Sequence, residues 1–109
     1  MRIIKSFNIL NKEINFKENI GFVPTMGSLH MGHLSLIKIA KKKSKKVLVS
    51  IFINPTQFNE RKDFVSYPKN IRKDIKLLKK LKVDYLFLPN TKEIYKKGIN
   101  KKFKIVKKD

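Results

Sequence analysis

The feature of this sequence that most restricts its fold is the apolar run at residues 47–53, Val-Leu-Val-Ser-Ile-Phe-Ile. Its apolar residues are nearly continuous, whereas a strand with one face in water alternates apolar and polar residues. A continuous run of this kind is typical of a strand that is covered on both faces, as in parallel sheets flanked by helices. The run therefore predicts a buried parallel strand and an α/β fold.

Helical patterns occur on both sides of this run. Ser6 is suited to cap a helix, and three apolar residues that follow at i, i+3 and i+7 share one face: Phe7, Leu10 and Ile14. A second helix is predicted from Leu29 or His30 to about Lys43. Three of its residues are expected to face inward: Leu36, Ile37 and Ala40. A third helix is predicted after Lys69, with its apolar residues on one face and its lysines solvated: Ile71, Ile75, Leu78 and Leu81 inward, Lys73, Lys76, Lys79 and Lys80 outward.

Strand patterns alternate with these helices. Short strands are predicted at 20–23, where Pro24 closes the apolar run, and at 83–88. Residues 54–69 contain two prolines and show neither period, so they are expected to form a long loop. A short capped helix near Asn90 and a last strand at 103–106 are also expected. The alternation predicts βαβ units in a Rossmann-like parallel sheet, which is incomplete because only three strands are well marked.

The net charge of +19 comes from 27 Lys and Arg residues against 8 Asp and Glu residues. Nearly all the cations are lysines, and only Arg2, Arg61 and Arg72 are arginines. This bias is typical of A/T-rich coding sequences, so we interpret the charge as a solvated basic surface. A polyanion-binding face is the alternative.

Several classes of protein are excluded by what the sequence lacks. There is no cysteine, which excludes disulfides, thiolate-bound metals and a cysteine nucleophile. No apolar stretch approaches the roughly 20 residues that span a bilayer, and the N-terminus lacks the apolar core of a secretory signal. We therefore expect no membrane partner and a cytoplasmic location.

The two histidines of the chain, His30 and His33, lie at i, i+3 in the first turn of the second predicted helix. A helix N-terminus attracts phosphate through its backbone donors, and imidazoles can add further donors. Gly27 and Gly32 leave room for a close approach of a nucleotide. The segment therefore favours a triphosphate site. Zinc binding and a purely structural role are the alternatives, although zinc would lack a third ligand.

A second group of candidate residues follows the buried strand. Asn54 and Gln57 are expected at the carboxyl edge of the sheet, where their neutral amides could bind hydroxyl and carboxylate groups. Phe52 and Phe58 could form an apolar wall beside a substrate. A simple turn at Asn54-Pro55 is the alternative. Asp63 and Tyr67 could likewise serve only to hold the loop.

Two motifs together resemble the pantothenate synthetase family. They are residues 21–33, Gly-Phe-Val-Pro-Thr-Met-Gly-Ser-Leu-His-Met-Gly-His, and residues 49–58, Val-Ser-Ile-Phe-Ile-Asn-Pro-Thr-Gln-Phe, followed by Asp63 and Tyr67-Pro68. The His-x-Gly-His part alone is shared with other nucleotidylyltransferases and class I aminoacyl-tRNA synthetases. The resemblance implies a Rossmann-like sheet of the HIGH-type nucleotidylyltransferase superfamily.

The same resemblance implies ATP-dependent condensation of pantoate with β-alanine through a pantoyl-adenylate, in a homodimer that uses Mg²⁺ with ATP and no prosthetic group. It implies that ATP contacts Met26, Gly27, Ser28, Leu29, His30, Met31, Gly32 and His33. His33 would be the catalytic proton donor and His30 would bind phosphates. Gln57, together with Asn54, would bind pantoate and β-alanine, and no residue is assigned to a metal.

Two departures from the family pattern set further expectations. Lys69 stands where the family usually has arginine, which replaces a planar fork by a point charge. Family members are also much longer, so residues 1–109 are expected to be the N-terminal part of a nucleotide-binding Rossmann-like domain, without its C-terminal half and second domain. Such a chain is expected to turn over slowly or not at all alone. Nucleic acid is not an expected partner.

Two other functions remain as alternatives. One is a different His-x-Gly-His nucleotidylyltransferase, which would not need residues 54–58. The other is a basic non-enzymatic module that binds polyanions through Lys41–Lys46 and Lys101–Lys108.

Overall fold

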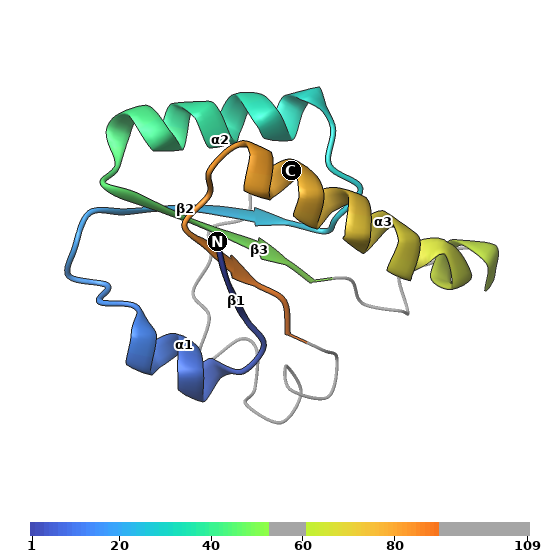
Figure 1. Cartoon of the computed structure of the whole chain (residues 1–109), viewed down its shortest axis with the longest axis horizontal. Helices are drawn as coiled ribbons and strands as arrows, with labels where there is room; N and C mark the ends of the chain where they lie inside the picture. The colour runs from blue at the N-terminus through green and yellow to red at the C-terminus, as the bar shows by residue number, and fades with distance from the viewer. Residues whose placement is uncertain (53–60, 90–109) are drawn as a thin grey trace.

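The computed structural model describes residues 1–52 and 61–89, and for residues 61–69 it describes the backbone alone. Four parallel strands form one sheet in the order β1-β4-β3-β2, and three helices connect them (Figure 1). The elements in chain order are β1 (Arg2–Ile4), α1 (Phe7–Glu13), β2 (Ile20–Thr25), α2 (Met31–Lys43), β3 (Lys46–Ile51), α3 (Arg61–Lys80) and β4 (Tyr85–Phe87). The predicted α/β fold with a parallel sheet is confirmed.

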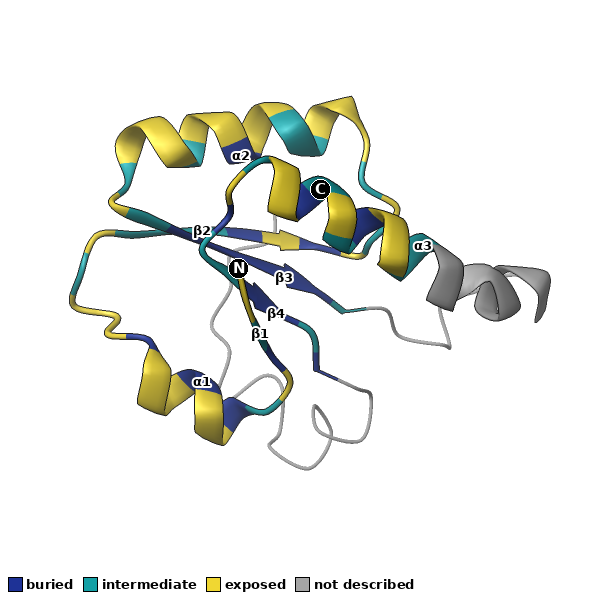
Figure 2. Cartoon of the chain, in the orientation of Figure 1, coloured by how far each residue is buried: buried dark blue, intermediate teal, exposed yellow. Residues whose placement is uncertain are grey.

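The sheet has helices on both faces, with α1 on one side and α2 and α3 on the other (Figures 1 and 2). The connection through α1 runs from β1 at one edge of the sheet to β2 at the opposite edge. The connections through α2 and α3 then run in the reverse direction, from β2 to β3 and from β3 to β4. Because parallel crossovers are right-handed, a chain that reverses its direction across a sheet places its helices on opposite faces. The topology thus puts α2 and α3 side by side over one face.

The central strand β3 is buried on both faces, as its apolar run predicts. Val47, Val49 and Ile51 contribute to the core under α2 and α3, where Ile37 and Leu78 are fully buried. Leu48, at the intervening position, belongs to a second core under α1. That second core contains Ile4, Phe7, Leu10, Ile14 and Phe87.

Helix α1 has the cap and the apolar face that its sequence predicts. The Ser6 hydroxyl accepts a hydrogen bond from the Ile9 N–H at 3.2 Å. Phe7 and Leu10 are buried, and the Phe7 ring packs edge-on against Phe87 with a centroid distance of 5.0 Å.

Strand β1 was not predicted from the sequence, because a three-residue segment has too little pattern of its own. It forms through tertiary pairing with β4: the Arg2 N–H donates to the Asp84 carbonyl and the Leu88 N–H to the Ile4 carbonyl. The Arg2 guanidinium also makes two hydrogen bonds to the Glu13 carboxylate, and these bonds lower the pKa of Glu13. The described residues therefore contain one strand more than the three that are well marked in the sequence.

Two proline positions differ from expectation. Strand β2 continues through Pro24 to Thr25. Proline has no N–H, but β2 lies at the edge of the described sheet, so no hydrogen bond of the sheet is lost at this position.

The predicted loop at 54–69 is wrong from Arg61 onward, because α3 begins there and contains Pro68. One proline removes one helical bond at a cost of about 3 kcal/mol, and the packed turns that follow Pro68 offset that cost. The elements expected near Asn90 and at 103–106 lie outside the described residues.

The face that α2 turns toward the core is narrower than expected. Ile37 is fully buried and Ala40 is half-buried, but Leu36 is 55% exposed, so its predicted inward position is wrong. Adjacent helical positions are about 100° apart, and α2 contacts the sheet through one narrow stripe of residues.

The inward and outward residues predicted for the third helix are confirmed from Ile71 to Leu81. Within the described ranges, no helix has the length and apolarity needed to cross a membrane.

These adjacent positions on α2 provide a matched test of the core. Ile37→Ala should lower the free energy of unfolding by about 2–5 kcal/mol, because it leaves a cavity between α2 and β3. Leu36→Ala should change it by less than about 0.5 kcal/mol. Chemical denaturation of the two variants measures both values, and equal losses at the two positions would contradict this placement of α2.

Candidate functional site

The histidine segment lies at the edge of the sheet where the strands end. It forms the loop from the end of β2 to the start of α2, and the beginning of α3 lies at the same side of the molecule (Figure 1). Ligands of open parallel sheets bind at this edge. The position agrees with the one predicted from the sequence.

Thr25, the last residue of β2, anchors the start of this loop. Its buried hydroxyl donates to the Ser50 carbonyl on β3 at 3.0 Å and accepts from the Gly27 N–H at 3.2 Å. One side chain thus ties the loop to two neighbouring strands.

The loop turns through two successive left-handed residues. Gly27 has φ 87° and Ser28 has φ 51°. Glycine adopts this conformation without a steric cost, whereas serine does so only when its surroundings hold it there. The Asn70 side-chain N–H donates to the Ser28 hydroxyl at 3.2 Å, which is one such restraint.

A stronger restraint comes from Asp74 on α3. This residue is 4% exposed, and its two carboxylate oxygens accept from the N–H groups of Ser28 and Leu29 at 2.8 and 2.9 Å. Asp74 was not predicted from the sequence as a site residue. The available signal was its position: Asp74 lies between Ile71 and Leu78 on the apolar face of α3, where a charge needs a specific partner.

The two histidines cap α2 reciprocally. The His30 Nδ1 accepts from the Gly32 N–H at 3.1 Å, and the His33 Nδ1 accepts from the His30 N–H at 3.2 Å. The rings lie 4.1 Å apart between centroids. Gly32 leaves room for this arrangement, because a Cβ there would lie 3.0 Å from the His30 Cε1 and the ring would have to shift slightly. The predicted helix start is confirmed, with His30 as the cap.

The caps determine the state of both imidazoles. A ring nitrogen that accepts a hydrogen bond carries no proton, so a neutral imidazole must then be protonated at Nε2. Burial lowers the pKa of His33, and the positive charge of His30 lowers it further by a smaller amount. The Asp74 carboxylate raises it in part. Because both Nδ1 atoms accept hydrogen bonds, both rings can donate through Nε2–H.

The backbone donors of the loop are less available than the sequence suggested. The N–H groups of Gly27, Ser28, Leu29, His30 and Gly32 all donate to side chains of the protein. The backbone N–H groups that were expected to attract phosphate at this helix start are therefore occupied by side chains at these positions. An anion at this site could accept from the imidazole Nε2–H groups without displacing these bonds.

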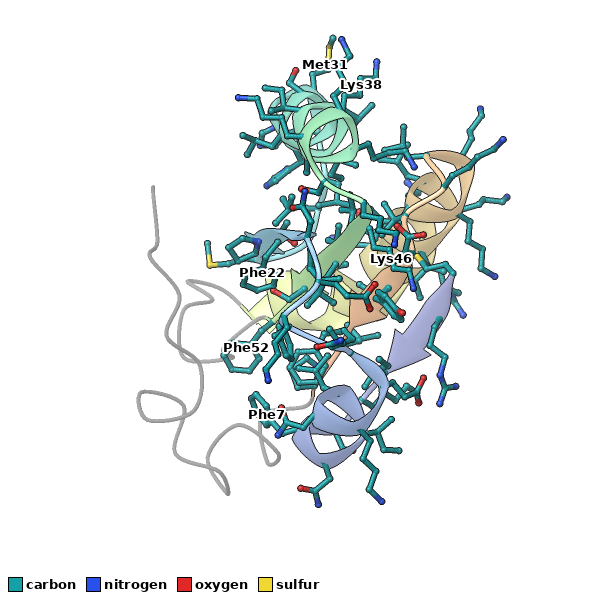
Figure 3. All side chains as sticks on the ribbon, turned by 90° about the vertical axis from the view of Figure 1, so that its left-hand side faces the viewer. Phe7, Phe22, Met31, Lys38, Lys46 and Phe52 are labelled. Atoms are coloured by element: carbon teal, nitrogen blue, oxygen red, sulfur yellow. The ribbon has the colours of Figure 1, made fainter. Side chains whose placement is uncertain are left out.

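The remaining described candidates differ in how far they are buried. Met26 and Met31 are exposed, at 58% and 83%. Phe52 is half-buried and packs with Phe22 against the core under α1 (Figure 3).

The other predicted site residues have no described side chain. Asn54, Gln57 and Phe58 lie outside the described residues. Asp63, Tyr67 and Lys69 lie in α3, where only the backbone is described.

Comparisons with known proteins agree on one family. The family model described as pantoate-beta-alanine ligase matches residues 2–108. Pantothenate synthetases of Francisella tularensis and Francisella philomiragia are each 50% identical over 95 residues, which cover 87% of this chain and 36% of each relative. The chain thus spans about a third of the length of these relatives.

Solved structures give the same result. The Francisella tularensis pantoate-beta-alanine ligase, complexed with beta-gamma ATP and β-alanine, matches at 48% identity with a TM-score of 0.73, covering 90% of this chain and 39% of that one. Pantothenate synthetase of Thermus thermophilus matches at 40% identity with a TM-score of 0.75, covering 90% of this chain and 35% of that one.

The ionisation of His33 is open to direct measurement. We expect its titration midpoint to lie below about 6.5, the ordinary value for histidine, and to rise in His30→Gln, where the neighbouring positive charge is removed. In the wild type, the lowered pKa means that His33 binds a proton more readily in the unfolded chain than in the folded one. The free energy of unfolding should therefore fall as the pH drops from about 6.5 through the folded midpoint. Ring-proton NMR against pH gives the midpoint. A wild-type value above about 6.5 would contradict the described burial.

Proposed function

This chain belongs to the pantoate–β-alanine ligase family, whose Rossmann-like fold is that of the HIGH-type nucleotidylyltransferases, and from this premise we propose that it carries the ATP site of such a ligase. The observation that carries the proposal is the reciprocal histidine cap at the end of β2, which presents two imidazoles as Nε2–H donors. The related ligase of Francisella tularensis, crystallised with an ATP compound and β-alanine, supports the same substrates here.

The proposed reaction joins pantoate to β-alanine in two steps. A pantoate carboxylate oxygen attacks the α-phosphorus of ATP, and the bond to the bridging oxygen breaks to release pyrophosphate. The amine of β-alanine then attacks the acyl carbon of the pantoyl-adenylate, loses a proton and releases AMP. Negative charge on the leaving pyrophosphate develops in the first step, and hydrogen-bond donors fixed beforehand stabilise it.

The site residues are assigned roles on this basis. Residues 26–33 contact ATP, with His30 on the phosphates and His33 as the catalytic group. Because the His33 Nδ1 accepts from a backbone N–H, His33 acts as a neutral Nε2–H hydrogen-bond donor to the phosphates rather than as an imidazolium acid. Asn54 and Gln57 bind pantoate and β-alanine.

Mg²⁺ enters with ATP as part of the substrate. The described residues contain no cluster of three or more His, Cys, Asp or Glu side chains that could hold a metal ion. Both oxygens of Asp74 are also committed to backbone donors. We assign the ion to the ATP phosphates because it is expected to accompany ATP as a substrate.

The family also supports proposals about organisation. Residues 1–109 form the N-terminal part of a nucleotide-binding domain, and the enzyme acts as a cytoplasmic homodimer. This chain alone keeps the nucleotide half of the site and turns over slowly or not at all.

Nucleotide binding tests the proposal. Calorimetric titration with Mg·ATP, with and without pantoate, should give saturable binding that weakens by about tenfold or more in His33→Ala, because a donor to a charged group is lost. Lys38→Ala, an exposed position on α2 (Figure 3), is the matched control and should bind as wild type.

The same titration separates the alternative of a polyanion-binding module. That alternative places binding on Lys41–Lys46 and Lys101–Lys108. Lys41–Lys43 form the last turn of α2, at the opposite end of this helix from the histidines, and Lys101–Lys108 lie outside the described residues. Binding through this surface would fall steeply with salt and would survive His33→Ala. That result, with no pantoate dependence, would contradict the proposed function.

A further inference from the structure

We propose that Asp74 is the positioning residue of the nucleotide loop, holding residues 28 and 29 so that both histidines present Nε2–H to the ligand. The proposal rests on the proposed function, because the ligand is taken to be ATP. It concerns a residue on a different element, since Asp74 lies 46 positions after Ser28 in the sequence. Asp74 is a buried charge to which the reaction itself assigns no step.

The contacts of Asp74 show what it holds. Each carboxylate oxygen accepts one backbone N–H, from Ser28 at 2.8 Å and from Leu29 at 2.9 Å. Hydrogen bonds to a charged acceptor are stronger than those between neutral groups, and a pair made by one rigid carboxylate fixes direction as well as distance. Two consecutive peptide groups are thereby fixed relative to α3.

Those peptide groups belong to the part of the loop that needs restraint. Gly27 and Ser28 both have positive φ, a conformation that serine adopts only when its surroundings hold it there. Without the carboxylate, the Ser28 N–H would lose its partner and the turn would relax. Among the described side chains of α3, Asn70 would still hold the Ser28 hydroxyl.

The restraint passes directly to the histidines through the backbone. Leu29, held by Asp74, immediately precedes His30, whose N–H donates to the His33 Nδ1 at 3.2 Å. If the 28–29 backbone turns, this N–H no longer points at the His33 ring. His33 is then free to take the other neutral tautomer, with the proton on Nδ1 and an acceptor at Nε2, and an acceptor repels phosphate oxygens.

A competing role for Asp74 predicts the opposite effect on binding. The carboxylate occupies two backbone donors near a helix start, a place that attracts phosphate in other proteins. If ATP displaced Asp74 from these donors, removing its charge would strengthen ATP binding. If Asp74 positions the loop, removing it weakens binding.

The test compares Asp74→Asn with Asp84→Asn in the full 109-residue chain. Asp84 is the matched control because its carboxylate also accepts a backbone N–H, from Val47 at 2.8 Å, where β3 begins rather than where it ends. We expect Asp74→Asn to weaken Mg·ATP binding by about tenfold or more, and Asp84→Asn to leave the affinity within about twofold while lowering the melting temperature.

Imidazole ¹⁵N NMR gives a readout that loss of stability alone would not change. In the wild type both histidines should show a protonated Nε2 and a bare Nδ1, and in Asp74→Asn the His33 signals should move toward a mixture of tautomers. The midpoint of His33 should also fall further, because the carboxylate that raises it is gone. If Asp74→Asn does not fold by circular dichroism, Asp74→Glu keeps the charge while displacing the oxygens, and it should show the same changes to a smaller degree.

The two proposals fail separately. If the wild type does not bind Mg·ATP, the proposed function is contradicted, and the tautomers of His33 still decide the role of Asp74. Unchanged tautomers in the Asp74 variants, or ATP binding as tight as or tighter than wild type, would overturn the positioning role.

Discussion

The site depends on one buried carboxylate that accepts two consecutive backbone N–H groups. Asp74 reaches Ser28 and Leu29 only because the sheet topology places α3 beside α2 on the same face. The β3–α3–β4 crossover and the β2–α2–β3 crossover run in the same direction across the sheet. The order of the strands therefore determines which helix lies over the end of β2, and the packing of α3 through Leu78 brings Asp74 to the loop.

This arrangement changes how the edge of the sheet can bind an anion. In many phosphate sites the backbone N–H groups of a helix start contact the ligand directly. Here Thr25, Asp74 and the two histidines use most of those groups to shape the loop. The imidazole Nε2–H groups remain as donors for a phosphate, and the same hydrogen bonds fix them in one tautomer. The backbone N–H groups thus hold the shape of the loop, and the two imidazoles are oriented to donate to a ligand.

The sequence predicted the features that depend on local pattern. The apolar run of β3, the Ser6 cap and the placement of His30 at the start of α2 each follow from residues close together in the chain. The errors arose where distant residues decide the structure. Strand β1 exists through pairing with β4, and Asp74 is recognisable only when α3 is packed against the loop. The two prolines and the absent period of residues 54–69 likewise predicted a loop, whereas α3 begins at Arg61 and continues through Pro68.

If Asp74 keeps its backbone partners when ATP binds, the imidazoles, and not the backbone N–H groups of residues 28 and 29, donate to the nucleotide phosphates. A crystal structure of this chain with a non-hydrolysable ATP analogue and Mg²⁺ would show which groups donate. We expect phosphate oxygens within hydrogen-bond distance of Nε2 of His30 or His33, with Asp74 still bonded to Ser28 and Leu29. Phosphate oxygens on those two backbone N–H groups, with Asp74 displaced from them, would contradict this expectation.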